Sequence, residues 1–331
     1  MKALKGKTRE RILFIVLVLS VVLNIVLLYM DHGPASNNSN DQSSSKETPN
    51  SADYPLLSKR IFVENQNDVI INFTPLRKAI RDYIDEQKAD IGIYFEYLPS
   101  GISISMNGEK EVRLASLSKV PIAMSVLRKV EKGSLKLDDV VTIKKEELDS
   151  KFGDLWRQGE GARFSVKQLL EFCLEKSDNT AYNALFDLLT AEEITGVYNN
   201  LDIEVLSPDT KPTVSPKSYS SILRSLYLAS YLNVDNSNYL LDILTKTVFS
   251  DKIPAGVPDT VKVAHKIGVF ETINKSQINQ IVYTDCGIVY FPNRPYIICA
   301  FVRHNEEDAK KYISYLSHMI YTYIAIARVE N

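Results

Sequence analysis

Ser116 and Lys119, in the stretch LASLSKVPIAMSVL, are the residues whose types and spacing best suit covalent chemistry. A serine hydroxyl is a weak nucleophile until a base removes its proton, and a lysine can be that base where burial or neighbouring cations lower its pKa. A spacing of three residues places both side chains on one face of a helix, one turn apart. At a helix start the backbone N–H of Ser116 is also unpaired and available to a developing oxyanion. The pattern alone is weak, because Ser43 and Lys46 match it equally well.

Two further short motifs carry polar groups that suit the same site. Ser177, Asp178 and Asn179 interrupt a helical pattern, and taken alone they indicate a turn between two helices with an Asx cap. Lys266 stands in the largely apolar stretch VAHKIGVF, two places before Gly268, and taken alone it is typical of a surface lysine on an edge strand. Each motif is therefore weak by itself, and its setting decides its meaning.

Periodicity and capping signals predict the elements that position these motifs. Helices are expected at 74–87 with Thr74 as N-cap, at 116–132, at 165–176 with a Ser165–Gln168 capping box, at 180–189, from 215 onward, and along an apolar stripe from Ala309 to Ile324. Strands are expected in the stretches DIGIYFEYLPSGISISM, VKVAHKIGVF, QIVYTDCGIVYF and YIICAFVRH. Strands at both ends of a helical middle predict an α+β fold, with one antiparallel sheet flanked by helices and an all-helical lobe.

The N-terminal segment is predicted to cross a membrane. Residues Ile12–Met30 carry no charge, and at about 1.5 Å per helical residue they nearly match a hydrocarbon core of roughly 30 Å. Five Lys or Arg residues precede this run and Asp31 follows it, so the positive-inside rule places residues 1–11 in the cytoplasm and the rest of the chain outside. The alternative is a cleaved signal peptide, whose apolar run is usually shorter.

Residues 31–55 are rich in Ser and Asn and contain few large apolar groups, so they are predicted to form a flexible linker. Residues 56–331 would then form one folded domain. Formal net charge is −2, which argues against nucleic acid as a partner. The odd set Cys173, Cys286 and Cys299 lacks metal-ligand spacing, so no metal or other cofactor is expected; Cys286 and Cys299 can face each other diagonally across the last hairpin, but buried thiols are favoured over a disulfide.

The order and setting of the three motifs resemble the serine β-lactamase and penicillin-binding protein superfamily. A serine–lysine pair opens a helix, Ser-Asp-Asn follows, and Lys-x-Gly lies on a late strand. The stretches ASLSKVPIAMSVL, SDNTAYNAL and IPAGVPDTVKVAHKIG are similar to the class A β-lactamase branch. The resemblance extends over residues 70–328.

The resemblance implies four catalytic residues. Ser116 would be the acylated nucleophile and Lys119 its general base. Ser177 would pass a proton to the leaving nitrogen. Lys266 would supply positive potential for a substrate carboxylate.

The resemblance also implies residues that contact the substrate. Asn179 would hold both the base and the substrate amide, and Gly268 would leave room beside the strand. The backbone N–H of Val269 would complete the oxyanion hole with that of the nucleophile. Trp156 falls where the family often places an aromatic residue at the cleft edge, although a packed tryptophan is an equal alternative.

The sequence departs from the class A pattern at two places. Ile267 replaces the usual Ser or Thr, so a hydroxyl for the substrate carboxylate is absent, unless His265 or Lys266 compensates. No E-x-x-L-N motif supplies the glutamate that deacylates class A enzymes, and Glu192, Glu193 and Glu204 are interpreted as surface carboxylates. Deacylation is therefore expected to be slow.

These observations predict a membrane-anchored extracytoplasmic serine hydrolase that forms an acyl-enzyme with β-lactams or with D-Ala-D-Ala-type peptides of peptidoglycan. Its partners would be these substrates and the bacterial membrane. Two alternatives stay open: a non-catalytic ectodomain that senses or binds wall fragments, and an esterase of the same fold. Ile267 supports the first alternative. It is also compatible with the second, because an ester substrate without a carboxylate would not need the missing hydroxyl.

Overall fold

The computed structural model describes residues 55–56, 71–203, 213–274 and 277–327. All of these residues belong to one compact unit, Pro49–Asn331. Within the described ranges no helix is long and apolar enough to span a bilayer. The predicted membrane span at residues 12–30, the segment before it and nearly all of the predicted linker lie outside these ranges.

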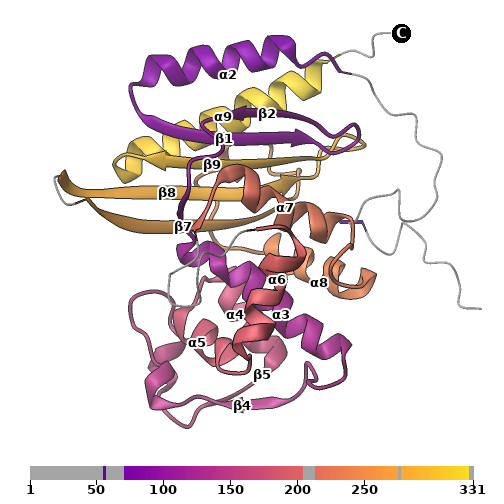
Figure 1. Cartoon of the computed structure of the whole chain (residues 1–331), viewed down its shortest axis with the longest axis vertical. Coiled ribbons are helices and arrows are strands. Elements are labelled where there is room, and N and C mark those ends of the chain that lie inside the picture. The colour runs from indigo at the N-terminus through magenta and orange to yellow at the C-terminus, as the bar shows by residue number, and fades with distance from the viewer. Residues whose placement is uncertain (1–54, 57–70, 204–212, 275–276, 328–331) are drawn as a thin grey trace, which may run out of the picture. The chain divides into compact units, whose positions relative to one another are not determined.

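A five-stranded antiparallel sheet organises the unit (Figure 1), and its strand order is β2-β1-β9-β8-β7. The strands are β1 Asp90–Tyr97, β2 Ile102–Met106, β7 Val263–Asn274, β8 Gln277–Val289 and β9 Tyr296–Arg303. β1 and β9 are buried along almost their whole length because elements cover both faces of the sheet, which explains their continuous apolar runs. The predicted strands at both ends of the chain and the α+β class are confirmed.

The structure describes eight α-helices. They are α2 Thr74–Gln87, α3 Lys119–Glu131, α4 Val166–Glu175, α5 Asn179–Phe186, α6 Ala191–Asn200, α7 Pro216–Tyr227, α8 Val234–Leu244 and α9 Glu306–Ile326. Three of these, α3, α4 and α5, carry or flank the candidate site motifs and lie in or near their predicted bounds. Short 3₁₀ helices are η3 Ala115–Ser118, η4 Lys145–Glu147, η5 Leu155–Gln158 and η6 Pro254–Gly256. Two small ribbons pair β3 Val112–Arg113 with β6 Thr213–Val214 and β4 Val140–Thr142 with β5 Arg163–Ser165.

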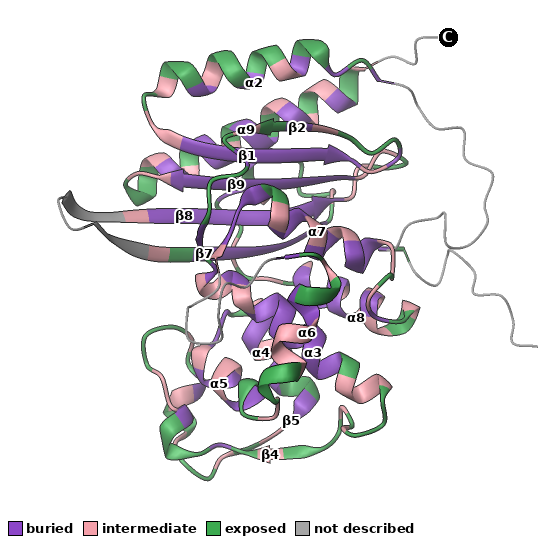
Figure 2. Ribbon diagram, viewed as in Figure 1, coloured by how far each residue is buried: buried purple, intermediate pink, exposed green. Residues whose placement is uncertain are grey.

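Two hydrophobic cores lie on opposite faces of the sheet (Figure 2). One face packs against α2 and α9, and the other packs against the helical lobe. Every residue of α3 from Lys119 to Leu127 is buried. A helix that is buried on all sides belongs at the centre of its lobe, so α3 holds its first turn firmly against the sheet.

Several local predictions need correction. Thr74 is the first residue of α2 rather than its N-cap, since Phe73 takes the cap position and the Thr74 backbone N–H donates to Asn72 Oδ1. Helices α6 and α8 were not predicted, although Thr190 with Glu193 forms a capping box at the start of α6. The predicted Ser165–Gln168 capping box is confirmed.

The cysteines are free and buried, as favoured by the sequence. Cys286 on β8 and Cys299 on β9 are direct partners in the register, not diagonal neighbours. The register of a hairpin depends on where its turn closes, and the Pro-Asn-Arg-Pro turn sets it here.

Candidate active site

Ser116 lies in the short 3₁₀ helix η3, and Lys119 is the first residue of α3. In a 3₁₀ turn, side chains three residues apart eclipse each other, which brings Lys119 Nζ to 3.3 Å from Ser116 Oγ. Ala115, just before the serine, has φ of 42°, a left-handed conformation that is costly for a residue with a Cβ. A residue keeps a strained backbone conformation only where the surrounding packing enforces it, and such residues are concentrated at functional sites. Ser116 itself remains partly exposed to solvent.

Lys119 Nζ is at the centre of the site. It donates at 2.7 Å to the Ser177 carbonyl oxygen and at 2.7 Å to Asn179 Oδ1. The side chain is buried, and burial lowers the pKa of Lys119 below its ordinary value. A neutral amine has two N–H donors and one lone pair. With the two donors committed to the two short bonds, the lone pair is left to accept the proton of a hydroxyl.

The Ser-Asp-Asn motif forms the turn between α4 and α5, as the Asx-cap interpretation predicts. Asp178 Oδ1 accepts from the Ala181 backbone N–H at 3.0 Å and caps α5, while Asp178 Oδ2 accepts from the Leu155 backbone N–H at 2.8 Å. Ser177 has φ of 55°, again left-handed. This turn aims the carbonyl and hydroxyl of Ser177 and the amide of Asn179 at Lys119. One motif therefore serves as a helix cap and as part of the site.

Lys266 reaches the same turn from the edge strand β7. Its Nζ donates to Ser177 Oγ at 2.8 Å and to the Ile267 carbonyl oxygen at 3.3 Å, and the side chain is fully buried. Burial, together with the nearby charge of Lys119, lowers the pKa of Lys266 to about 7. The ammonium also lies 5.7 Å from the centre of the Phe249 ring. Lys266 is thus a buried residue of the candidate site and not the surface lysine on an edge strand that its motif alone indicates.

Gly268 allows β7 to approach η3. A Cβ at this position would come within 2.6 Å of Thr284 Oγ1 and 3.2 Å of Leu117 Cγ, so any side chain would push the strand away. Thr284 Oγ1 in turn donates to the Gly268 carbonyl oxygen at 3.1 Å. This contact brings the backbone at Gly268 and Val269 beside the turn that carries Ser116. Thr284 was missed by the sequence reasoning because no local pattern links β8 to η3.

Ile267 lies on the sheet face opposite that of Lys266, because side chains alternate along a strand. Its register partner is Asp285, whose carboxylate accepts from the Ile253 backbone N–H at 3.0 Å and contacts His265 Nδ1 at 2.8 Å. Because a carboxylate only accepts, the hydrogen of this second bond lies on His265 Nδ1. His265 is buried in this contact, and Lys266 is committed to Ser177. Neither residue offers an exposed group that replaces the missing hydroxyl.

Trp156 lies in η5, where its ring stacks with the Arg157 side chain at 5.2 Å. No contact described in this part of the chain joins it to the candidate catalytic residues. Two other aromatic rings lie next to the lysines: the Tyr182 ring is 5.7 Å from Lys119 Nζ, and the Phe249 ring is 5.7 Å from Lys266 Nζ.

Phe152 contacts the Ser-Asp-Asn motif through its backbone, since its carbonyl oxygen accepts from the Asn179 backbone N–H at 3.0 Å, and its ring lies 5.8 Å from that of Phe249. Phe152 is 40% exposed, so it borders the site at the surface. Its only sequence signal was an aromatic residue in a polar loop.

Two of the three glutamates that the sequence singled out, Glu192 and Glu193, lie in α6. Glu192 is exposed, and Glu193 pairs with Lys129 at 3.1 Å, so neither contacts Ser116 or Lys119 in the described structure. Glu204 lies outside the described residues. Within the described ranges, no group of three or more His, Cys, Asp or Glu side chains is arranged to hold a metal ion.

Residues 75–324 match the family model described as the beta-lactamase enzyme family. The chain belongs to this family. It is a serine hydrolase of the beta-lactamase type, and the predicted superfamily is confirmed.

Two curated members of the beta-lactamase family show how far the likeness extends. A beta-lactamase of Proteus vulgaris is 28% identical over 273 residues, which covers 77% of this chain and 85% of that protein. A beta-lactamase of Bacteroides uniformis is 24% identical over 269 residues, covering 74% of this chain and 90% of that protein.

Solved structures of beta-lactamases and of a penicillin-binding protein share the fold. The structure of PBP-A has a TM-score of 0.69 at 25% identity and covers 78% of this chain and 99% of its own. A variant of PBP-A, solved as an acyl-enzyme complex with penicillin G, has a TM-score of 0.67 at 26% identity, with 76% and 97% covered. The TLA-3 extended-spectrum beta-lactamase has a TM-score of 0.70 at 20% identity, with 76% and 99% covered.

Proposed function

We propose that this chain forms an acyl-enzyme at Ser116 with β-lactams or with D-Ala-D-Ala-type peptides and that it hydrolyses this intermediate slowly. The observation that carries the proposal is the contact between Ser116 Oγ and Lys119 Nζ, the latter buried and held by Ser177 and Asn179. A lysine with a lowered pKa next to a serine is the arrangement that activates the hydroxyl.

The proposed acylation moves protons between Ser116, Lys119 and Ser177. Lys119 accepts the Ser116 proton as Oγ forms a bond to the carbonyl carbon of the substrate. The oxyanion that results is stabilised by the backbone N–H groups of Ser116 and Val269. When the carbon–nitrogen bond breaks, the Ser177 hydroxyl gives its proton to the leaving nitrogen, and the proton is replaced from Lys119 through the 3.2 Å contact.

The slow second step is proposed from the two described glutamates of the interval after the Ser-Asp-Asn motif, Glu192 and Glu193. Hydrolysis of the ester needs a base that activates water. Neither Glu192 nor Glu193 approaches Ser116, since the first is exposed and the second is bound to Lys129. We therefore expect penicillin to stay attached, which is the behaviour of a penicillin-binding protein. The acyl-enzyme complex of the PBP-A variant with penicillin G supports this expectation.

The location is also a proposal. The uncharged run Ile12–Met30, with basic residues before it, supports a membrane anchor with the catalytic domain outside the cytoplasm. Peptidoglycan peptides are found in that compartment. Alkaline carbonate extraction of membranes, followed by protease treatment of intact cells, tests both the anchor and its orientation.

One experiment separates the candidate activities. The full chain, purified in a non-ionic detergent, is incubated with fluorescent penicillin and with a chromogenic cephalosporin, and Ser116→Ala is the control. Stable labelling of the parent chain alone supports the proposal, and rapid cephalosporin turnover contradicts slow deacylation. Absence of any adduct contradicts acylation by β-lactams. An assay with an aryl ester then tests the esterase alternative, which the buried apolar Ile267 favours because an ester substrate needs no carboxylate partner.

A further inference from the structure

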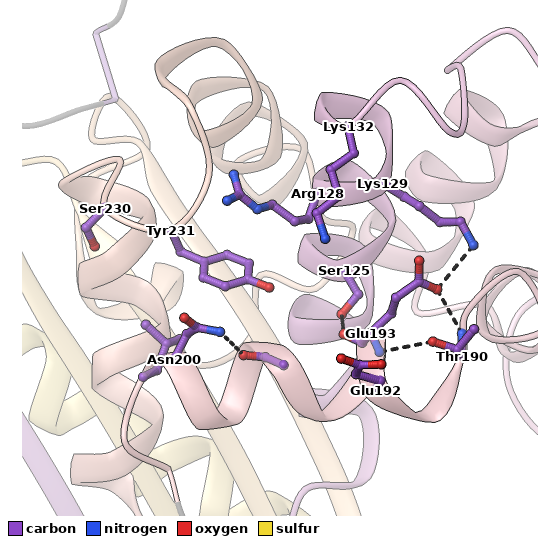
Figure 3. Close-up of a pocket in the computed structure, with 12 residues that line it drawn as sticks. Ser125, Arg128, Lys129, Lys132, Thr190, Glu192, Glu193, Asn200, Ser230 and Tyr231 are labelled. Carbon is purple, nitrogen blue, oxygen red and sulfur yellow. Dashed lines mark hydrogen bonds and ion pairs between the residues drawn. The ribbon is translucent and has the colours of Figure 1, made fainter.

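A polar pocket of 740 Å³ opens in the helical lobe, lined by none of the candidate active-site residues (Figure 3). Its walls are the C-terminal half of α3, one side of α6, and the turn between α7 and α8. Ser125 Oγ of α3 donates to the Glu193 carbonyl oxygen of α6 at 2.9 Å and fixes the two helices together. Pockets of this volume commonly hold a small ligand.

The α3 wall carries three cations. Lys132 follows Arg128 by four residues and Lys129 by three, so it lies next to both on the helix surface, and all three line the pocket. Lys129 is neutralised, since it pairs with Glu193 at 3.1 Å and donates to the Leu188 carbonyl oxygen at 2.6 Å. Lys132 is exposed, and no ion pair of the described residues includes it. Arg128 is paired with Glu131 at 2.7 Å, so the cation of this wall that no ion pair of the described residues includes is Lys132.

Arg128 is held in place before any ligand arrives. Its Nη1 donates to Glu131 Oε2 at 2.7 Å, and its guanidinium lies 5.8 Å from the centre of the Tyr231 ring. Glu131 is fixed in turn, because its Oε1 accepts from the Asn233 backbone N–H at 2.7 Å and from Asn236 Nδ2 at 3.1 Å. A guanidinium held in this way still has N–H groups for a second oxyanion, and little side-chain entropy is lost on binding.

The opposite wall offers space and hydroxyl-binding groups. A Cβ at Gly196 would meet no atom within 4 Å, so this part of α6 is open to the pocket. Asn200 Nδ2 donates to the Gly196 carbonyl oxygen at 2.6 Å, which turns the amide oxygen away from that bond and leaves it as an acceptor. Figure 3 shows the Tyr231 ring extending from its turn into the space between α3 and α6, and Glu192 on the far side, beside Thr190.

From these contacts we propose that the pocket binds a hydroxylated, sugar-sized ligand that carries a carboxylate or a phosphate. Lys132, together with the Arg128 N–H groups that do not contact Glu131, would bind the oxyanion. The Tyr231 ring would pack against the apolar face of the sugar, and Asn200 would accept from a sugar hydroxyl. Glu192, at the other side of the pocket, repels a second negative charge, so a ligand with one anionic group is favoured over a polyanion.

Isothermal titration calorimetry with the full chain in detergent tests the proposal. The probes are N-acetylmuramic acid, which carries a carboxylate, glucose 6-phosphate, which carries a phosphate, and N-acetylglucosamine, which is uncharged. At least one anionic probe should bind, more weakly as salt is raised, and which one binds distinguishes the two anions. Binding by neither anionic probe, or equal binding of the uncharged sugar, overturns the proposal.

Paired substitutions locate the site. Lys132→Met should weaken binding by about tenfold, since it removes one charge-assisted contact, whereas Lys311→Met, at another exposed lysine, should leave it unchanged. Gly196→Phe should fill the pocket and abolish binding, and Gly196→Ala should retain it, because its Cβ meets no neighbour. Circular dichroism and labelling by fluorescent penicillin report whether each variant is folded. An equal loss in Lys132→Met and Lys311→Met, or full binding by Gly196→Phe, places the ligand elsewhere and overturns the proposal.

Discussion

Lys119 Nζ and Lys266 Nζ both contact the same oxygen, Ser177 Oγ, at 3.2 Å and 2.8 Å. One lysine comes from the central helix α3 and the other from the edge strand β7. Two buried ammonium groups around one hydroxyl repel each other, so the pair gives up a proton more readily than an isolated lysine does. We therefore expect both the rate of acylation and the free energy of unfolding to depend on the proton content of this pair.

The rate of acylation should have a bell-shaped dependence on pH. It rises as the base Lys119 loses its proton, and it falls as Lys266, with a pKa of about 7, loses the charge that attracts an anionic substrate. The rate of labelling by fluorescent penicillin between about pH 6 and about pH 10 measures this profile. Lys266→Arg keeps its charge across that range and should lack the falling limb. A parent rate that keeps rising to the alkaline end contradicts the role of Lys266.

Stability should also depend on pH through Lys266. In the unfolded chain its pKa returns to the ordinary 10.5, whereas in the folded protein it is about 7. Between these values the unfolded state binds a proton that the folded state does not, so the free energy of unfolding rises with pH. The slope is on the order of 1 kcal/mol per pH unit from this group.

Lys266→Met removes this contribution, so the stability difference between Lys266→Met and the parent should be largest near pH 7 and shrink toward pH 10. Urea denaturation of both proteins at matched pH values measures the difference. A difference that stays constant with pH would show that Lys266 titrates normally in the folded protein.

Lys119→Met should reduce the rate of acylation by about 10²- to 10⁴-fold, the usual contribution of a general base. The substitution preserves the length of the side chain and removes the nitrogen that contacts Ser116 Oγ at 3.3 Å. Stopped-flow measurement of penicillin labelling gives the rate, with Lys311→Met as the matched control. A near-normal rate in Lys119→Met would assign the base to another residue.

Ile267→Thr should accelerate acylation by penicillin by roughly tenfold or more, because a charge-assisted hydrogen bond contributes about 1.5–3 kcal/mol. Ile267→Val is the matched control, since valine has the shape of threonine without the hydroxyl. The ratio of the two rates isolates the hydroxyl from the change in packing. Equal rates in the two variants would indicate a site that was not built for a carboxylate at this position.

Gly268→Ala should destabilise the protein by about 1–3 kcal/mol, because its Cβ would lie 2.6 Å from Thr284 Oγ1. The strand would also move from η3, so labelling of Ser116 should slow. Adding Thr284→Ala removes the closest clash and should recover part of the loss, which a double-mutant cycle by urea denaturation measures. Gly196→Ala, with no neighbour within 4 Å, is the control for a glycine-to-alanine change. Additive effects of the two substitutions would contradict the contact.

Periodicity, caps and turn residues are local signals, so the α+β class, the sheet-forming strands and the three motifs could be predicted without the structure. The sequence did not predict α6 and α8, since their apolar patterns are short and their packing partners are distant in the chain. The predicted i, i+3 pairing of Ser116 and Lys119 holds, but in a 3₁₀ turn and not in the α-helix proper.

The contacts between the motifs depend on long-range packing. Ser177 and Lys266 are separated by 89 residues, and their hydrogen bond exists because β7 packs against the helical lobe across Gly268. The same packing buries both lysines and lowers their pKa values, an effect that no local pattern of residues contains. The position of the Phe152 backbone beside Asn179 has the same origin, since the path of a loop is set by the surfaces it crosses.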